Sequence, residues 1–180
     1  MAKNHQINFK LTETEGSVIF DKLKNEETQI VFTRVFEEIT EFDSVLIDED
    51  DFVLVSPSSR DINNQEKYID ISELANESFI LLNEQTNLYK PVINLFEKSG
   101  ITPDIFYKGN RFDLISEMVA EGMGLSIVPR KIAESMTSNK IKIIDIIDSP
   151  QSRLGFFKNK NFRQDNIDQF WNEIKEYELQ

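Results

Sequence analysis

One stretch of the chain, Arg111 to Arg130 (RFDLISEMVAEGMGLSIVPR), constrains the fold more than any other. Its first half repeats apolar residues at the spacing of one helix face, which predicts an amphipathic helix. Gly122 stands where that helix would end in a left-handed residue, and Gly124 permits a second close turn. Leu125 to Val128 is too short for a helix and is typical of a buried parallel strand, after which Pro129 fits the first position of another helix. The stretch therefore predicts a helix, a turn, a strand and a second helix.

Strands and helices alternate along the rest of the chain, as judged from the spacing of its apolar residues. Strands are expected at residues 5–11, 28–34, 44–47, 52–55, 79–82, 104–107, 141–147 and 153–157, and further helices at 17–24, 88–98 and 165–178. This alternation predicts an α/β fold with mainly parallel sheets. A chain of 180 residues is long enough to bury a core in one domain or in two small lobes.

Four short segments follow one another in an order that a known family shares. They are FVLVSP at residues 52–57, ISELANESFI at 71–80, FEKSGITP at 96–103 and MVAEGMGLSIVP at 118–129. Together they resemble the effector-binding domain of LysR-type transcriptional regulators, over roughly residues 5–175. A single Gly-x-Gly turn would be a weak signal, whereas four segments in the right order are a strong one.

This resemblance implies a two-lobed fold of the type 2 periplasmic-binding-protein kind, with a cleft for a small-molecule effector between the lobes. The polar connectors 57–68 and 149–152 are the candidate boundaries. We expect lobe I to be discontinuous, with residues 1–57 plus 151–180, and lobe II to contain residues 58–150. By the same resemblance, the domain is expected to form homo-oligomers, either dimers or tetramers.

The beginning of the chain departs from the family pattern. The family's effector domain starts with a strand and a helix that precede the strand resembled by Gln6 to Leu11. We find no counterpart of these two elements, and we expect lobe I to be incomplete, rearranged or completed by another chain. Loss of a strand from inside a sheet leaves unpaired backbone edges, which invite association.

The charge of the chain argues against direct DNA binding. It has 20 Lys and Arg against 32 Asp and Glu, a net charge of −12, whereas a duplex is bound by clustered cations that replace phosphate counterions. By resemblance, DNA contact would belong to a winged helix-turn-helix at the amino end of a parent protein, and we expect that region to be absent from this chain. The sequence has no cysteine, no apolar run long enough to span a membrane and no secretory signal. We therefore expect a cytoplasmic sensor that does not bind membranes.

The amino ends of three predicted helices supply candidate effector contacts. Free N–H groups and the helix dipole favour anions there, and in two-lobed α/β proteins these ends are expected near the cleft. Ser17 and Thr86, with neighbouring Asn87, could donate hydrogen bonds to a carboxylate or phosphate. Arg111, next to Asn110, could add charge and bidentate geometry. The plainer alternative is that Ser17, Thr86 and Asn110 only cap their helices.

Three further residues complete the predicted effector site. Ser56, Val128 and Pro129 belong to segments that, by resemblance, line the effector pocket in the family. The alternative is structural, because proline and small residues at strand ends often only shape turns.

Catalysis, metal binding and cofactor binding are poorly supported. The only histidine is His5, so no Ser-His-Asp or Cys-His arrangement has a base in the predicted core. The acidic run Asp48 to Asp51 lacks the glycine and spacing of a calcium loop, and we interpret it as a solvated turn. Gly122 and Gly124 lack the further glycine of a dinucleotide loop. We expect no catalytic residue, no metal and no cofactor.

Two alternatives to a transcriptional regulator stay open. A stand-alone solute-binding protein would share the two-lobed fold, and an upstream secretion signal or lipid-attachment cysteine would favour it. A small enzyme on the same fold would be excluded by a turnover screen that yields no product. An upstream helix-turn-helix would favour the regulator.

Overall fold

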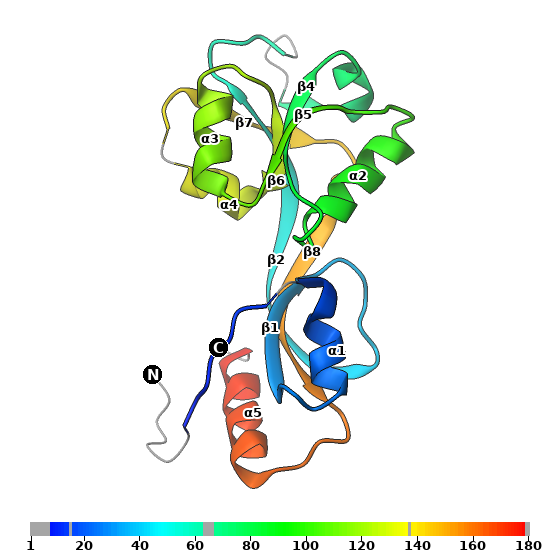
Figure 1. Ribbon diagram of the computed structural model, residues 1–180, viewed down its shortest axis with the longest axis vertical. Helices are drawn as coiled ribbons and strands as arrows, with labels where there is room; N and C mark the ends of the chain where they lie inside the picture. Colours follow the sequence, from blue (N-terminus) through cyan, green and yellow to red (C-terminus); the bar gives the residue numbers. More distant parts are fainter. Residues whose placement is uncertain (1–7, 15, 63–66, 137, 179–180) are drawn as a thin grey trace. The chain divides into compact units, whose positions relative to one another are not determined.

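The structure is a computed structural model that describes residues 8–14, 16–62, 67–136 and 138–178. Figure 1 shows its ribbon, coloured along the chain. The chain forms two compact units: unit 1 contains residues 1–48 and 154–180, and unit 2 contains residues 49–153. Two long strands, β2 (Phe42–Pro57) and β8 (Gln151–Asn159), pass through the two boundaries.

Unit 1 consists of η1 (Gly16–Val18), α1 (Ile19–Lys24), β1 (Ile30–Val35) and α5 (Asp165–Glu178), together with parts of β2 and β8. Its described strands lie in the order β1, β8, β2, with β1 at the edge. Leu23 of α1 shares a buried cluster with Phe42, whereas Trp171 of α5 shares a second cluster with Val45. Phe42 and Val45 differ by an odd number of positions on β2, so they point to opposite faces. Each face of the sheet is therefore packed against one helix.

Unit 2 joins the second half of β2 to the strands β3 (Tyr68–Ile69), β4 (Ser78–Leu82), β5 (Asp104–Gly109), β6 (Ser126–Pro129) and β7 (Ile141–Ile146). Residues 52–57 of β2 are all buried. They pair antiparallel with β6 and β7, so that Val53 lies opposite both Val128 and Asp145. β3 pairs parallel with β7, and β4 pairs parallel with β5.

Helices cover the strands of unit 2 from two sides. They are η2 (Ile71–Leu74), α2 (Tyr89–Lys98), α3 (Phe112–Ala120) and α4 (Arg130–Ser135). Figure 1 shows α3 and α4 on one side of the strands and α2 on the other. Phe79 of β4 and Phe96 of α2 are fully buried, and their rings meet edge to face with centroids 4.7 Å apart. This contact lies in the apolar core of the unit.

The stretch from Arg111 to Arg130 folds as the predicted succession of helix, turn, strand and helix, namely α3, β6 and α4. Gly122 has a φ of 78°. The N–H groups of Gly122 and Met123 bond to carbonyl oxygens in the last turn of α3, at 2.9 and 3.1 Å. These two bonds form a Schellman motif, which is the helix end predicted for a left-handed glycine.

Gly124 is required by a close approach between β6 and β4. A Cβ at this position would lie 2.8 Å from the carbonyl oxygen of Ser78. The two segments are joined here by hydrogen bonds from Leu125 N–H to Ser78 O at 2.9 Å and from Ile80 N–H to Leu125 O at 2.8 Å. Pro129 ends β6 and is the N-cap of α4, one position before the helical position predicted for it.

The acidic run Asp48 to Asp51 lies within β2, so its interpretation as a solvated turn is wrong. The strands predicted on either side of it are one continuous strand. Asp50 is buried, and its carboxylate accepts a hydrogen bond from the N–H of Lys131 at 3.3 Å. The neighbouring Asp51 binds the guanidinium of Arg130. These partners lie far away in the sequence, which explains why the acidic composition was misleading.

The strand predicted at residues 5–11 is not found at residues 8–11, and residues 5–7, including His5, lie outside the described residues. The apolar alternation instead brings Phe9 against Phe170 of α5, with ring centroids 4.8 Å apart, while Leu11 is 91% exposed. Alternation encodes an apolar face, but a strand also needs a hydrogen-bonding neighbour.

The predicted α/β fold is confirmed, and its sheets are mixed rather than mainly parallel. The units divide at residues 48/49 and 153/154, whereas the sequence suggested boundaries at 57/58 and 150/151. The difference arises because β2 stays within the unit 2 sheet up to Pro57, and the polar connector begins only there.

Candidate functional site

Seven of the eight predicted effector contacts belong to unit 2, and Ser17 belongs to unit 1. Ser17 lies in η1, but its side chain is outside the described part of the chain. The seven contacts in unit 2 form three groups, which lie on β2 with β6, before α2 and before α3.

The first group lies in the centre of the unit 2 sheet. Ser56 and Val128 are fully buried, on β2 and β6 respectively, and Pro129 at the end of β6 is buried as well. The Ser56 hydroxyl donates to the carbonyl oxygen of Pro57 at 3.2 Å. All three residues are thus packed inside unit 2. The alternative offered by the sequence, that such residues only shape turns, applies to Pro129, which ends β6 and is the N-cap of α4.

The second group precedes α2. Thr86 is half-buried, and its hydroxyl donates to the carbonyl oxygen of Asn83 at 2.9 Å. The N-cap of α2 is Leu88, which makes no side-chain capping bond. Thr86 therefore stabilises the preceding turn and does not cap the helix, and Asn87 lies beside it, half-buried.

The third group precedes α3. Arg111 is the N-cap of this helix and makes no side-chain capping bond, and Asn110 is exposed just before it. The guanidinium of Arg111 instead binds the Asp113 carboxylate, with Nε to Oδ1 at 3.1 Å and a second contact through Nη2. This hydrogen bonding lowers the pKa of Asp113. The alternative that Asn110 caps α3 is therefore wrong.

Ser126 is a further residue of β6 that is not among the eight predicted effector contacts. It lies on β6 opposite Val55 and is fully buried. Its hydroxyl has no hydrogen-bond partner among the described residues. A buried hydroxyl without a partner is costly, so such a group is a candidate for contact with a bound water or ligand. The signal was present in the sequence, as one serine in an otherwise apolar strand.

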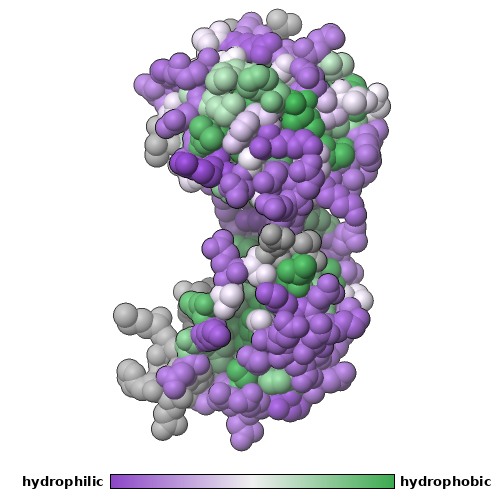
Figure 2. All heavy atoms as spheres, viewed as in Figure 1, coloured by the Kyte–Doolittle hydropathy of each residue, from purple (hydrophilic) through white to green (hydrophobic). Residues whose placement is uncertain are grey.

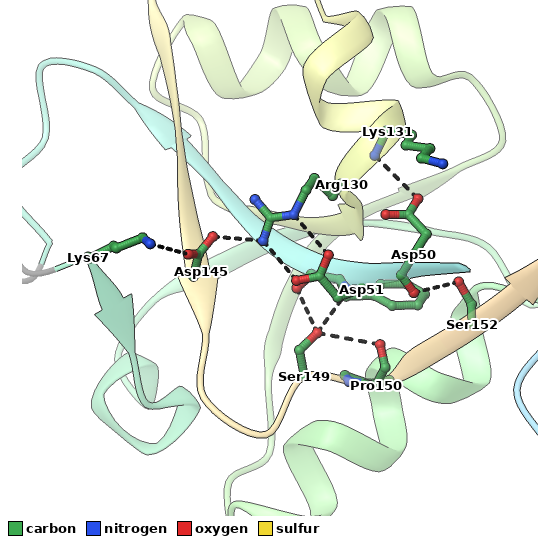
Figure 3. Close-up of polar contacts among 10 residues, drawn as sticks. Asp50, Asp51, Lys67, Arg130, Lys131, Asp145, Ser149, Pro150 and Ser152 are labelled. Atoms are coloured by element: carbon green, nitrogen blue, oxygen red, sulfur yellow. Dashed lines mark hydrogen bonds and ion pairs between the residues drawn. The ribbon is translucent and has the colours of Figure 1, made fainter. Parts of the chain in front are cut away.

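A polar cluster around Arg130 links three elements of unit 2 (Figure 3). Arg130 binds Asp51 of β2 as a fork, with Nε to Oδ1 and Nη2 to Oδ2 both at 2.8 Å. Nη2 also donates to Oδ1 of Asp145 on β7 at 2.7 Å. Lys67 lies at the far side of Asp145, with Nζ 4.0 Å from Oδ2. One guanidinium thus connects the start of α4 to two strands.

The cluster continues towards the ends of unit 2. The Ser149 hydroxyl accepts a hydrogen bond from the N–H of Phe52 at 2.8 Å and donates to its carbonyl oxygen at 2.7 Å. The hydroxyl of Ser152, at the start of β8, donates to the carbonyl oxygen of Asp50 at 2.9 Å. The segment 149–152 is therefore tied to β2 by side chains (Figure 3).

The electrostatics of the cluster favour its charged form. Hydrogen bonds from Arg130 hold the pKa of Asp51 below its ordinary value, against a smaller opposing effect of burial. Hydrogen bonds to Asp51 and Asp145 raise the pKa of Arg130. The Arg130 side chain is 30% exposed, so water screens part of this attraction.

Unit 1 contains a groove of about 600 Å³ along its edge strand β1. The extended residues 8–14 form one wall, and apolar side chains that include Phe32, Phe156 and Phe170 line it. Phe32 is 49% exposed although its ring centroid lies 4.5 Å from that of Phe156. Figure 2 shows apolar side chains gathered at the surface of unit 1 in this view.

No group of three or more His, Cys, Asp or Glu within the described ranges is arranged to hold a metal ion. The part of the chain that the structure describes contains no helix long and apolar enough to cross a membrane.

Comparison with known proteins identifies the class of the chain. The family model described as "LysR substrate binding domain" matches residues 1–178. The chain therefore belongs to the LysR substrate-binding domain family.

Curated relatives agree with this assignment. An uncharacterized HTH-type transcriptional regulator of Bacillus subtilis (strain 168), YwbI, is 32% identical over 96 residues, which are 53% of this chain and 31% of YwbI. The chain spans between 31% and 42% of the length of the curated relatives it matches. These relatives are named as transcriptional regulators and not as enzymes, which agrees with the absence of a predicted catalytic residue.

Solved structures share the fold at low sequence identity. The regulatory domain of Synechocystis PCC6803 CcmR, in complex with 2-PG, has a TM-score of 0.75 and 18% identity, covering 91% of this chain and 80% of that one. The effector-binding domain of QuiR in complex with shikimate has a TM-score of 0.70 and 18% identity, covering 92% and 78%.

Proposed function

We propose that this chain is the effector-sensing domain of a LysR-type transcriptional regulator and that it binds a small anionic metabolite in a cleft between its two lobes. The observation that carries the proposal is the family match, which extends over residues 1–178. The two structural neighbours named above bind 2-PG and shikimate, which are small molecules.

Two features of the described residues support the anionic character of the effector. The N-cap residues of α2 and α3 make no side-chain capping bond, and the dipole at a helix N-terminus favours an anion. Thr86 and Arg111 stand beside these two helix ends. An anionic effector would take the Thr86 hydroxyl from Asn83 and compete with Asp113 for the guanidinium. Ser126 adds a buried hydroxyl that a ligand could engage. Ser17, Ser56, Asn87, Asn110, Val128 and Pro129 complete the proposed set of contacts.

The proposed mechanism is a shift between two arrangements of a parent regulator. An effector changes such an equilibrium only if it binds one arrangement more tightly than the other. In this proposal an attached winged helix-turn-helix contacts DNA, and the sensor domains assemble as dimers or tetramers in the cytoplasm. The net charge of −12 fits a sensor that leaves DNA contact to another domain.

Thermal-shift measurements test this function directly. We expect 2-PG, shikimate or another member of a panel of small carboxylates, amino acids and aromatic acids to raise the melting temperature, because a ligand that binds the native state stabilises it. With the best ligand of the panel, Thr86→Ala and Arg111→Ala should each weaken binding in calorimetry. Thr102→Ala and Arg163→Ala are matched controls, since both residues are exposed and outside the proposed set. Unchanged affinity in both the Thr86 and the Arg111 variants would contradict the proposed anion site.

We also propose that lobe I is incomplete at the groove in unit 1. The groove lies between the edge strand β1 and the extended residues 8–14, which are not in a strand. Together these leave room for one more extended segment, supplied by another chain. Sedimentation equilibrium tests this proposal: a self-associating chain is expected, and a stable, well-folded monomer would contradict completion by a partner.

A further inference from the structure

The turn between β6 and α4 carries two proposed effector contacts and is followed at once by Arg130. Val128 and Pro129 end the strand, and Arg130 is the first residue of the helix. Any displacement of this turn must therefore move the backbone of Arg130. The contacts of the Arg130 side chain determine which other elements such a displacement would move.

Arg130 holds β2 more firmly than it holds β7. The Asp51 fork uses two nitrogens and both carboxylate oxygens, at 2.8 Å each, which fixes the plane of the guanidinium as well as its position. The contact with Asp145 uses one oxygen at 2.7 Å, and Lys67 offers that carboxylate a second cation. The fork with Asp51 is thus the geometrically constrained half of the cluster.

Asp51 lies at the end of unit 2 through which β2 leaves it. Unit 2 begins at Glu49 and ends at Arg153. The carboxylate of the adjacent Asp50 accepts a hydrogen bond from the N–H of Lys131, and its carbonyl oxygen accepts one from the hydroxyl of Ser152. The start of α4 is thereby linked to both strands at the point where each leaves unit 2.

We propose that Arg130 is a positioning residue that couples the turn at Val128 and Pro129, two proposed effector contacts, to the two strands leaving unit 2, through its fork with Asp51. The inference rests on the proposed function, since it describes how a structural change on effector binding would reach the rest of unit 2. The coupled element is the pair of strand ends, residues 49–53 of β2 and residues 149–153 before and at the start of β8. Asp145 contributes to the charge around Arg130 but not to this coupling.

Two isosteric variants separate coupling from charge. Asp51→Asn and Asp145→Asn each remove one negative charge beside the same guanidinium without changing side-chain volume. The measured quantity is the hydrogen-exchange rate of the Phe52 amide, which donates to Ser149 and reports on the link between the strand ends. We expect Asp51→Asn to raise this rate about tenfold and Asp145→Asn to leave it within about twofold, because exchange follows local opening.

Lys140→Gln is the matched control for loss of an ion pair. Its partner is Glu121 at 2.7 Å, both side chains are exposed, and the pair touches neither strand end. Arg130→Lys keeps the charge but loses the fork, so it should behave as Asp51→Asn does. Equal exchange at Phe52 in the Asp51 and Asp145 variants, or an increase spread evenly over unit 2 including Phe79, would overturn the proposal.

A second experiment uses 2-PG and shikimate as probes. In the unchanged chain, a bound probe should slow exchange at the Ile127 and Val128 amides and at Phe52 together. In Asp51→Asn, the same probe should protect Ile127 and Val128 alone, and protection of Phe52 in that variant would contradict the coupling. If neither probe binds, the choice of ligand fails, while the ligand-free comparison of Asp51 and Asp145 still decides the role of Arg130.

Discussion

The two units differ in how completely their strands are covered. In unit 2, residues 52–57 of β2 are buried between β6 and β7. In unit 1, β1 is the outer strand of the described sheet, Phe32 on it is 49% exposed, and a groove runs beside it. The centre of unit 2 is therefore a closed core, although its outer strand β5 exposes 58% of Phe106. In unit 1 the groove lies directly beside the edge strand, which is an edge of the kind that invites pairing.

Helix ends show the same difference. The left-handed residue that follows α2 and α3 is glycine, at Gly100 and Gly122, with φ values of 71° and 78°. The residue in the same position after α1 is Glu26, with a φ of 61°. A side chain in this conformation strains the backbone, so one helix of unit 1 ends at a cost that unit 2 avoids.

The largest expected effect tests the contrast between the two cores. Phe79→Ala should lower the free energy of unfolding by about 3–5 kcal/mol, because it removes a fully buried ring that packs on Phe96. Phe32→Ala should cost less than about 1.5 kcal/mol, because half of that ring is already in water. Urea unfolding of both variants measures the difference, and similar losses would erase the contrast.

The second effect compares an ion cluster from each unit. Arg130→Gln should cost about 2–3 kcal/mol, since it leaves Asp51 without its cation beside Asp145, which keeps only the distant Lys67. In unit 1, Lys158 is 3% exposed and binds Asp168 at 3.1 Å, whose side chain is 36% exposed. Lys158→Met should change stability by no more than about 1 kcal/mol, because water can solvate Asp168 and methionine fills the buried space.

Chemical denaturation of both cation variants measures this effect. The comparison fails if Lys158→Met costs as much as Arg130→Gln, since the unit 1 pair would then be equally important to the fold.

The third effect concerns the helix ends. Glu26→Gly should stabilise the chain by about 0.5–1 kcal/mol, because glycine adopts positive φ without strain. Gly122→Ala should destabilise it by about 1 kcal/mol for the same reason, since an added Cβ there meets no atom within 4 Å and only the backbone is strained. Melting temperatures of the two variants should therefore move in opposite directions, and a shift of both in one direction would refute the explanation.

The smallest effect is a pH dependence that arises in unit 2. The pKa of Asp51 is lowered by hydrogen bonds from Arg130, so its folded-state pKa lies below its unfolded value. The corresponding stabilisation is complete above the unfolded pKa, about 3.9, and is lost as the pH falls through the folded value. Urea titrations between about pH 7 and pH 2.5 should show a smaller acid-induced loss in Asp51→Asn than in the unchanged chain. Equal losses would mean that Asp51 does not contribute to acid sensitivity.

Sequence patterns within one segment predicted the elements that are determined by residues near one another in the sequence. The helix Asp165–Glu178 has the predicted bounds, because its apolar residues repeat at helical spacing and its partners need not be known. The turn at Gly122 was predictable for the same reason, since helix ends select glycine at one position. The continuous strand β2 was not, because its acidic residues are compensated by Arg130 and Lys131, about eighty positions later.

The candidate site shows a similar limit. Thr86 and Asn110 precede helices, as predicted, but their positions relative to the N-caps depend on the turn that begins at Asn83 and on the end of β5 at Gly109. The Arg130 cluster joins residues from three elements, and no local spacing marks it. Ser126 could have been found, since a hydroxyl in an apolar strand needs a partner that the strand itself does not supply.

The continuity of β2 limits how the gene can change in length at this point. Successive side chains of a strand alternate between its two faces. The face on which each side chain of β2 lies therefore depends on its position in the strand, for Phe42 and Val45 in unit 1 as for Asp51 and Val53 in unit 2. Inserting or deleting one codon within β2 would turn the β2 residues on one side of the change to the opposite face of their own sheet, unless a β-bulge absorbs the change. Most connections between compact units tolerate such changes. Here, only replacements and even-numbered indels would preserve the parity.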